Sequence, residues 1–369
     1  MKTIRTLFLT AVMLLGLNPA NYAQSTVNSS NLLVYSFFVN VVPDQFNIPL
    51  VGFINIANGS HKSAHIGFVN YNQKDFLGAQ VSFINTTGGN TEGMQVGFIN
   101  TSVDSLKGAQ VGFINTVCKK SLGGQVGFVN TSIQATKGVQ VGFVNTVWNK
   151  ADGIQVGFVN TVTNRLNGAQ VGFVNTTAKA LNGFQVGFVN TAMSLNGLQL
   201  GFVNYADSLK GGIPVGFVSI VRKGGYQAVE LSCTEMYPVN LSFKIGVKSI
   251  YSSLIASYNP NNTERFALGA GLGSIIPISE KFFFNPEVMY QHTTEVKTKQ
   301  LLSLSGNFGY SVIPRLSVLL GPSLVWNHTW NNDPLNAPFF SLYTDNIDAK
   351  NSLHFGARLS VRYSFGDAK

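Results

Sequence analysis

Residues 108–116 read Gly-Ala-Gln-Val-Gly-Phe-Ile-Asn-Thr, and this stretch decides the fold because it is repeated along the chain. The phenylalanine of the motif recurs every 15 residues from Phe53 to Phe188, and again at Phe202 and Phe217. Stepping back once more to Phe38 gives thirteen copies. A fixed period of this length indicates a repeat architecture. We assign residues 24–222 to this tandem array.

Within one copy, the side chains alternate as they do in a β-strand. The alternation puts Val111, Phe113 and Asn115 on one face, and Gln110 and Ile114 on the other. We therefore expect one strand across the motif, and the period of 15 indicates that the phenylalanines pack in a core or face lipid. The remaining residues of each copy are mostly polar and predict a turn. A leucine recurs at the end of this turn, shortly before the glycine: Leu106, Leu166, Leu181, Leu195 and Leu209.

Two architectures fit this repeat, a β-solenoid and a continuation of a membrane barrel. In a β-solenoid each copy is one coil, with a ladder of phenylalanines inside the stack and ladders of glutamine and asparagine at polar positions. In an up-and-down barrel each copy is one strand followed by a turn. We favour the solenoid, because successive turns do not alternate between two kinds and because the recurring leucine needs a core to enter.

The composition favours an exported all-β protein over a cytosolic enzyme. Of 369 residues, 45% are hydrophobic and only 11% are charged, and glycine is frequent at 38 residues. A disordered chain would be far less apolar and aromatic. The formal net charge is +9, but no more than two basic residues occur in succession, so nucleic-acid binding has little support.

Residues 1–23 are predicted to be a cleaved secretory signal. Lys2 and Arg5 precede an apolar run, and small residues lead to Ala23. No later stretch offers about 20 unbroken apolar residues, so we expect no transmembrane helix. Two cysteines, Cys118 and Cys233, cannot define a disulfide framework. They could pair in an oxidising compartment or be two small buried residues.

Residues 223–369 lack the repeat and predict an antiparallel, outer-membrane-type β-barrel region. Short connections between amphipathic segments alternate with longer polar ones, as in outer-membrane barrels. Aromatic residues near the segment ends could form interfacial girdles. A periplasmic or extracellular antiparallel sheet is the alternative. The predicted strands are Tyr226–Met236, Val239–Ser249, Tyr251–Asn259, Arg265–Ile278, Lys281–His292, Gln300–Ile313, Leu316–Trp330 and Ser352–Phe365.

The repeats, together with the stretches Gly212–Tyr226 and Phe243–Lys248, resemble the surface-repeat proteins of Gram-negative bacteria. In that family, tandem Gly-x-Gln-x-Gly-x-x-Asn repeats are joined to a barrel-like C-terminal region. The resemblance covers almost the whole chain after the predicted signal. It implies an outer-membrane or cell-surface location, and it supplies no catalytic residue, ligand or cofactor.

No group of residues is predicted to be a catalytic, cofactor-binding or metal site. His61 and His65 have a helical metal-ligand spacing, but we place them in a solvated turn where the two rings do not converge. The stretch Gly269–Gly273 is glycine-rich like a phosphate loop, but it lies in a strand-like segment with no following helix. Acid–base or nucleophile groupings could be assembled from residues whose geometry nothing in the sequence fixes. These are Glu230, Glu235, Glu287, His292, Ser252, Ser253 and His354.

We therefore expect a non-enzymatic outer-membrane or cell-surface protein whose array is a structural or adhesive scaffold. Rows of glutamine, threonine and asparagine could hold a repetitive partner, such as a glycan or another surface protein, through many weak contacts. Outer-membrane lipid is the other expected partner, and the oligomeric state stays open. The alternative is a porin-like channel in which the repeats continue the barrel. A barrel-embedded hydrolase is the third hypothesis.

Overall fold

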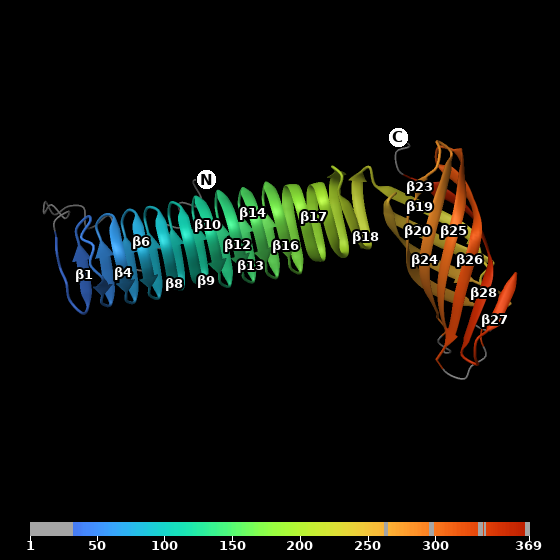
Figure 1. The fold of residues 1–369 in the computed structure, drawn as a ribbon, viewed down its shortest axis with the longest axis horizontal. Coiled ribbons are helices and arrows are strands. Elements are labelled where there is room, and N and C mark those ends of the chain that lie inside the picture. The colour runs from blue at the N-terminus through green and yellow to red at the C-terminus, as the bar shows by residue number, and fades with distance from the viewer. Residues whose placement is uncertain (1–31, 262–264, 295–298, 331–334, 336, 366–369) are drawn as a thin grey trace.

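A computed structural model describes residues 32–261, 265–294, 299–330, 335 and 337–365. The predicted signal, residues 1–23, lies outside the described residues. Figure 1 shows two parts, an elongated stack of short strands followed by a barrel. All the regular elements in the described ranges are strands, which confirms the all-β class. In those ranges no helix is long and apolar enough to cross a membrane.

The first part is a β-solenoid whose coils pair in parallel with a shift of one repeat. Asn130, for example, pairs with Asn115 of the preceding coil and with Asn145 of the following one. Neighbouring strands of an up-and-down barrel pair antiparallel, so the structure excludes the hypothesis that the repeats are successive barrel strands. The strands of the array are β1 (Val39–Val42), β2 (Leu50–Val51), β3 (Ile54–Ala57), β4 (His61–Ile66), β5 (Val69–Asn72), β6 (Phe76–Val81), β7 (Ile84–Thr87), β8 (Thr91–Ser102), β9 (Leu106–Val117), β10 (Lys120–Val126), β11 (Val129–Ser132), β12 (Ala135–Val141), β13 (Val144–Val147), β14 (Lys150–Val156), β15 (Val159–Val162), β16 (Arg165–Val171), β17 (Val174–Leu209) and β18 (Ile213–Lys223).

Each coil has two strand segments joined at a corner, and this corner corrects the predicted position of the phenylalanines. In the coil of β12 and β13, Gly142 and Phe143 form the corner, and the side chains of Gln140 and Asn145 on either side of it are both buried. The alternation therefore changes phase at the corner. Phe143 is left on the outside, 45% exposed. The stacked phenylalanines line an outer edge of the solenoid, not its interior.

The interior of the array holds two ladders of side-chain amides. Gln140 Nε2 donates to Gln125 Oε1 of the preceding coil at 2.7 Å. Asn130 Nδ2 donates to Asn145 Oδ1 of the following coil at 2.8 Å and to the carbonyl of Val141 at 2.9 Å. Buried amides are tolerated because each finds partners in the neighbouring coil. The turn leucines enter the core as predicted, since Leu106, Leu166, Leu181 and Leu195 are 0% exposed.

The phenylalanine edge forms one continuous row of parallel rings. From Phe53 to Phe217, eleven successive pairs have ring centroids 4.9–5.1 Å apart and interplanar angles of 0–9°. The spacing equals the distance between paired strands, so it follows from the backbone register. The twelve rings are each 41–54% exposed.

Glycine is required next to this edge, because the coils approach one another closely there. A Cβ atom on Gly142 would lie 2.1 Å from the carbonyl oxygen of Gly127 and 2.5 Å from Asn130 Nδ2. The second glycine of the repeat is needed for its backbone angle: Gly138 has a φ of +139°, which side chains of L-residues rarely permit. These two requirements explain why the repeat contains glycine twice.

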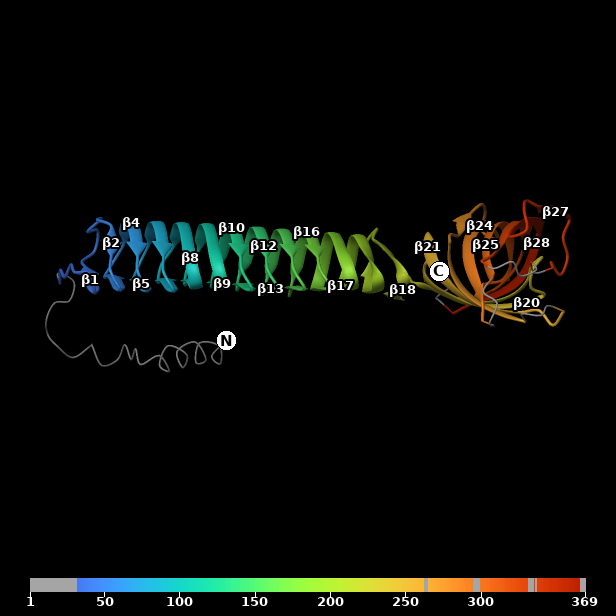
Figure 2. The same cartoon turned by 90° about the horizontal axis from the view of Figure 1, so that it is seen from below.

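The second part is a closed antiparallel barrel of eight strands, which confirms the predicted order of an array followed by a barrel. Closure comes from pairing between the first and last barrel strands, where Glu230 is the register partner of Arg362. Figure 2 shows the curved barrel wall beside the array. The barrel strands are β19 (Tyr226–Cys233), β20 (Val239–Val247), β21 (Ile250–Tyr258), β22 (Phe266–Gly273), β24 (Phe282–Thr293), β25 (Lys299–Ile313), β26 (Leu316–Thr329) and β28 (Asn351–Ser364), and two further strands, β23 (Ile276–Pro277) and β27 (Tyr343–Asn346), pair with β24 and β28.

The array and the barrel are joined by a packed contact. The core of the last coils, including Val221, continues into Val247 and Ile250 at the turn between β20 and β21. Ser252 Oγ on the barrel donates a hydrogen bond to the carbonyl of Gly216 in the last coil. The barrel wall thus covers the end of the solenoid.

Candidate functional site

The barrel is polar inside and apolar outside. The charged residues within its eight strands are all 0–4% exposed: Glu230, Lys244, Glu287, Lys299, Arg358 and Arg362. Side chains at the alternate positions are large and apolar, and many are half exposed. Those that are 50–59% exposed include Leu231, Leu241, Leu268, Phe282, Leu304, Phe308, Leu320 and Leu359. This polarity is the reverse of that of a water-soluble sheet packed on an apolar core.

Two carboxylates and three cations form a cluster within the barrel. Glu230 accepts from Arg358 Nη2 at 2.6 Å and from Arg362 Nε at 2.6 Å. Glu287 accepts a hydrogen bond from Lys244 Nζ at 2.5 Å, and its Oε2 forms an ion pair with Arg358 Nη1 at 2.8 Å. These residues lie on β19, β20, β24 and β28, so the cluster ties together strands on opposite sides of the closed sheet.

Neutral side chains extend this cluster. Tyr251 donates its hydroxyl hydrogen to Glu287, and Asn285 Nδ2 donates to Tyr251 Oη at 2.6 Å. The side chains of Lys244 and Arg362 also lie over the Tyr251 ring, at 5.3 Å and 5.8 Å from its centroid. The arrangement neutralises buried charge and fills the bore with side chains.

The structure brings together only two of the four sequence candidates for acid–base chemistry. Glu230 and Glu287 share their cations, whereas Glu235 accepts instead from Ser323 Oγ at 2.5 Å. His292 lies on the opposite face of β24 from Glu287. Sequence reasoning missed the cationic partners Lys244, Arg358 and Arg362. Their signal was charge at the inward positions of strands whose outward positions carry none.

The serine and histidine candidates are not joined into a catalytic group. Ser252 contacts the array, as described above. His354 instead contacts Ser352 Oγ at 2.9 Å and Thr344 Oγ1 at 3.1 Å. Among the described residues, no hydrogen bond joins Ser252 or Ser253 to His354, so the hydrolase hypothesis gains no nucleophile–base pair there.

His61 and His65 contradict the prediction that they lie in a solvated turn with diverging rings. Both belong to β4, are 0–1% exposed, and approach each other with His65 Nε2 3.0 Å from His61 Nδ1. They converge because they occupy the leucine and glutamine positions of the repeat, which both point into the same coil. The described residues contain no group of three or more His, Cys, Asp or Glu side chains able to hold a metal.

We expect His65 to make the first coils sensitive to acid. Burial, and secondly the neighbouring His61, lower the pKa of His65 to about 3. In the unfolded chain this histidine binds a proton near pH 6.5, so the stability that neutral His65 allows is fully present above pH 6.5. As the pH falls from 6.5 towards 3, the unfolded state takes up a proton that the folded state does not, and the free energy of unfolding decreases by up to about 1.4 kcal/mol per pH unit. His65→Gln continues the glutamine ladder and should flatten this dependence. Hydrogen exchange of β4 and β6, measured at several pH values in the parent protein and in the His65→Gln variant, gives this pH dependence of local stability. The same dependence on pH in the two proteins would contradict the prediction.

Glycines in β22 reflect close strand approach. A Cβ atom on Gly269 would lie 2.1 Å from the carbonyl oxygen of Tyr290, and one on Gly271 would lie 2.3 Å from that of Val288. The stretch Gly269–Gly273 is therefore strand, as predicted, and not a phosphate loop.

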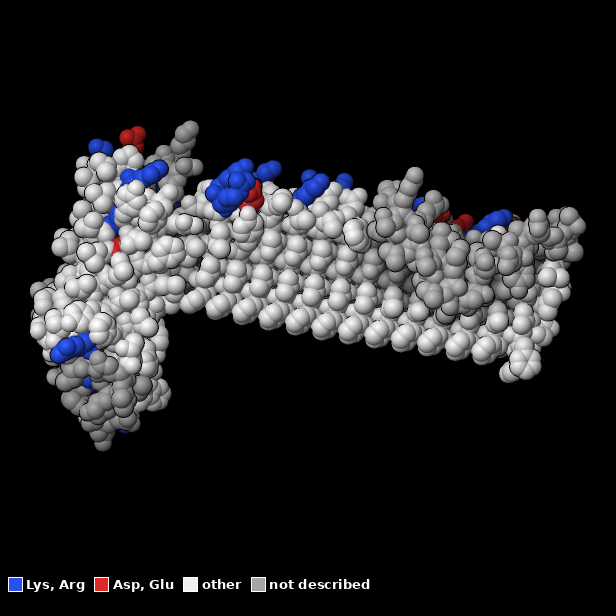
Figure 3. Space-filling model, turned by 180° about the vertical axis from the view of Figure 1, so that it is seen from behind, with Lys and Arg blue, Asp and Glu red and all other residues white. Residues whose placement is uncertain are grey.

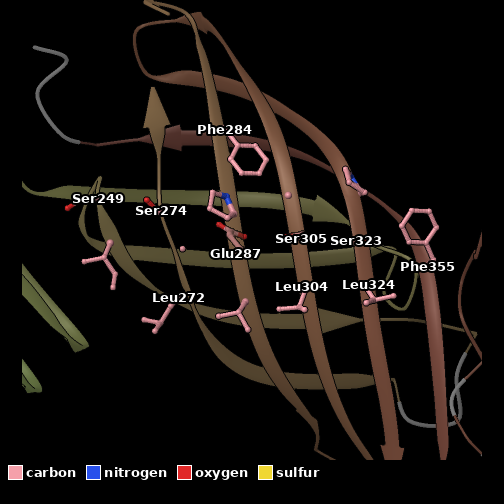
Figure 4. A pocket seen from close by; sticks show the side chains of 16 residues that line it. Ser249, Leu272, Ser274, Phe284, Glu287, Leu304, Ser305, Ser323, Leu324 and Phe355 are labelled. Carbon is pink, nitrogen blue, oxygen red and sulfur yellow. The ribbon is translucent and has the colours of Figure 1, made fainter. Parts of the chain in front are cut away.

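A cavity of about 610 Å³ lies against the barrel wall (Figure 4). It follows a row of small or cyclic residues across the strands, including Ser274, Pro286, Gly306 and Pro322. Large apolar residues, among them Leu304, border the row. The cavity is apolar and offers no catalytic grouping.

The two cysteines are free thiols in the structure. Cys118 follows β9 in the array and Cys233 ends β19 in the barrel, and each is only partly buried. The structure therefore contradicts a disulfide between them, and it leaves both side chains half-buried where the alternative prediction had two small buried residues. Burial raises the pKa of the Cys118 thiol, with a smaller contribution from Asp104.

Comparison with known proteins gives one structural similarity. No protein-family model matches the chain, and no curated protein matches it. Among solved structures, the chain is similar to the crystal structure of Neisserial surface protein A (NspA), with 12% identity and a TM-score of 0.21. The match covers 38% of this chain and 94% of that one. At this identity and TM-score the similarity says nothing about what this chain does.

Proposed function

We propose that this chain is a non-enzymatic outer-membrane protein whose barrel crosses the lipid and whose array is a rigid structural scaffold. The observation that supports this most strongly is the polarity of the barrel. A closed barrel satisfies its backbone hydrogen bonds internally and can face hydrocarbon, and alternation of apolar outward and polar inward residues is typical of outer-membrane barrels. In water the same half-exposed leucines and phenylalanines would form a large apolar surface.

A structural role suits the array better than an adhesive one. The adhesive hypothesis relied on rows of glutamine, threonine and asparagine, and of these the glutamine and asparagine amides are buried and bonded to one another, which leaves only the half-buried threonines for a partner. What remains is a stack held by backbone pairing, two amide ladders and a packed joint with the barrel. Such a stack transmits force and keeps a fixed length, which is what a scaffold needs.

We expect the purified full-length protein to show no discrete conductance steps in planar bilayers. The hypothesis of a wide pore built from the repeats is excluded by their parallel pairing, and the bore of the eight-stranded barrel holds the buried cluster around Glu230 and Glu287. The same sample should migrate differently on gels before and after heating, as folded barrels do. Regular ion steps would support a channel, and a heat-independent band in a water-soluble sample would contradict the membrane anchor.

A further inference from the structure

Charge is confined to one edge of the array. No Asp, Glu, Lys or Arg occurs from five residues before to four residues after any of the twelve phenylalanines between Phe53 and Phe217. The charged residues of each repeat lie in the turn and just after it, on the edge opposite the phenylalanine row. Figure 3 shows them along one margin of the array, with none on the rest of the visible face.

The uncharged part of the array presents rows of apolar side chains on its outer surface, with one row of half-buried threonines beside them. Two residues before each phenylalanine stands Val, Ile or Leu, and Val111, Val126 and Val141 of this row are 38%, 47% and 39% exposed. The amides are inside, and the backbone donors of the strands pair from coil to coil. Between the two ends of the stack, the backbone of the array is therefore satisfied internally, which is the requirement that hydrocarbon imposes.

The height of the uncharged part matches one leaflet of a membrane. In every repeat, the five residues before the phenylalanine carry no charge. At about 3.3 Å per residue, these five steps span roughly 16 Å. The hydrocarbon core of a bilayer is about 30 Å thick, so one leaflet contributes roughly 15 Å.

The barrel is oriented so that the array can occupy that position. The barrel strands run across the long axis of the array, and the barrel extends beyond the array on the side of β27 (Figure 1). The charged edge of the array lies on the other side (Figure 3). The short turns at residues 248–249 and 314–315 also lie at the barrel end away from β27, because they adjoin the end of β28, whereas β27 pairs with its beginning. The phenylalanine edge thus faces the same way as the end of the barrel with the long loops.

We propose that the array is seated in a lipid leaflet beside the barrel, with its phenylalanine edge towards the membrane midplane and its charged edge among the headgroups. This inference rests on the proposed membrane-spanning barrel. Outer-membrane barrels carry their short turns on the periplasmic side, so the leaflet is the inner, phospholipid one. The uncharged face of the array and the apolar wall of the barrel then form one continuous lipid-facing surface.

The experiment measures the depth of single labels on the full-length protein. In a background of Cys118→Ser and Cys233→Ser, a fluorophore is attached at Val126→Cys on the uncharged face or at Lys137→Cys on the charged edge. The protein is reconstituted in phospholipid vesicles that carry doxyl groups near the middle of the acyl chain, and iodide serves as the aqueous quencher. We expect doxyl lipid to quench the label at 126 several-fold more than that at 137, and iodide to show the reverse order.

A third label at Leu304→Cys, on the barrel wall, separates the two proposals. If doxyl lipid fails to quench it, the membrane-spanning barrel is wrong. If it is quenched while iodide reaches 126 as readily as 137, the array stands in water and this inference is overturned. If neither quencher reaches the label at position 126 and the protein molecules cross-link to one another, a second copy covers this face. That result would also overturn the inference that the array lies in lipid.

The side of the membrane is tested on intact cells with a thiol reagent that cannot cross the outer membrane. We expect it to label Asp345→Cys in β27, near the long loops, and to leave Lys248→Cys at the short turn unlabelled until the cells are opened. The opposite pattern would place the array in the outer leaflet and overturn the assignment to phospholipid.

Discussion

Glu287→Gln should destabilise the barrel by about 3–5 kcal/mol, because it removes one of the two carboxylates that balance three buried cations. Lys244 and Arg358 would keep only Glu230 as an ionised partner, deep inside a closed sheet. The shape of the side chain is nearly unchanged, so the loss reports on charge and not on packing. The full-length protein is unfolded with urea in detergent micelles, and heat-modifiable gel migration reports the folded fraction. The decrease in the urea concentration at the midpoint measures the loss of stability.

The matched control is Glu280→Gln, which changes the same residue type in an exposed turn. Surface changes of this kind usually alter stability by less than about 0.5 kcal/mol. If both variants unfold at the same urea concentration as the parent, the buried cluster does not contribute as its geometry implies.

Leu166→Asp should disrupt the array locally at a cost above the roughly 2–5 kcal/mol of a leucine truncation, because a buried carboxylate is added to the lost packing. Leu166 is 0% exposed and belongs to the core cluster that includes Leu181 and Ala151. Its loss should expose the backbone of several adjacent coils. Hydrogen exchange mass spectrometry locates the effect, and we expect rapid exchange centred on β14, β16 and β17.

The same substitution at Leu122 is the control. Leu122 is 43% exposed, and its register partners in the neighbouring coils are Lys107 and Lys137. An aspartate there meets two lysines at the water-facing edge, so Leu122→Asp should leave exchange unchanged or slow it slightly. Equal protection in the two variants would mean that the assigned inside and outside of the coil are wrong.

Much of the array could be predicted from the sequence, and the reason is the repeat. A fixed period of 15 makes parallel pairing of equivalent residues the simplest arrangement, as seen for Asn130 and Asn145. The leucine of the turn was correctly placed in the core. The phenylalanine was not, because one unbroken alternation was assumed across Gly142 and Phe143 where the chain turns a corner.

The burial of the histidine pair was missed for a different reason. His61 and His65 were judged by helical spacing and by the polarity of a turn, whereas their positions within the repeat already matched a leucine and a glutamine that point inward. Comparison with the neighbouring copies would have shown them to be buried. In the barrel, alternation placed Glu230 and Glu287 on the inward face, but could not show which cations they meet.

The sequence by itself determined the class, the order of the two parts and the coil-to-coil register, because periodicity of 15 and of 2 is a local property of the chain. Only the tertiary structure decided that amides line the solenoid and phenylalanines its edge, since that depends on where each coil bends. It alone also joined Glu230 to Arg358, which lie 128 residues apart. Closure of a barrel brings its first and last strands together, and the alternation of residues within each strand does not indicate that contact.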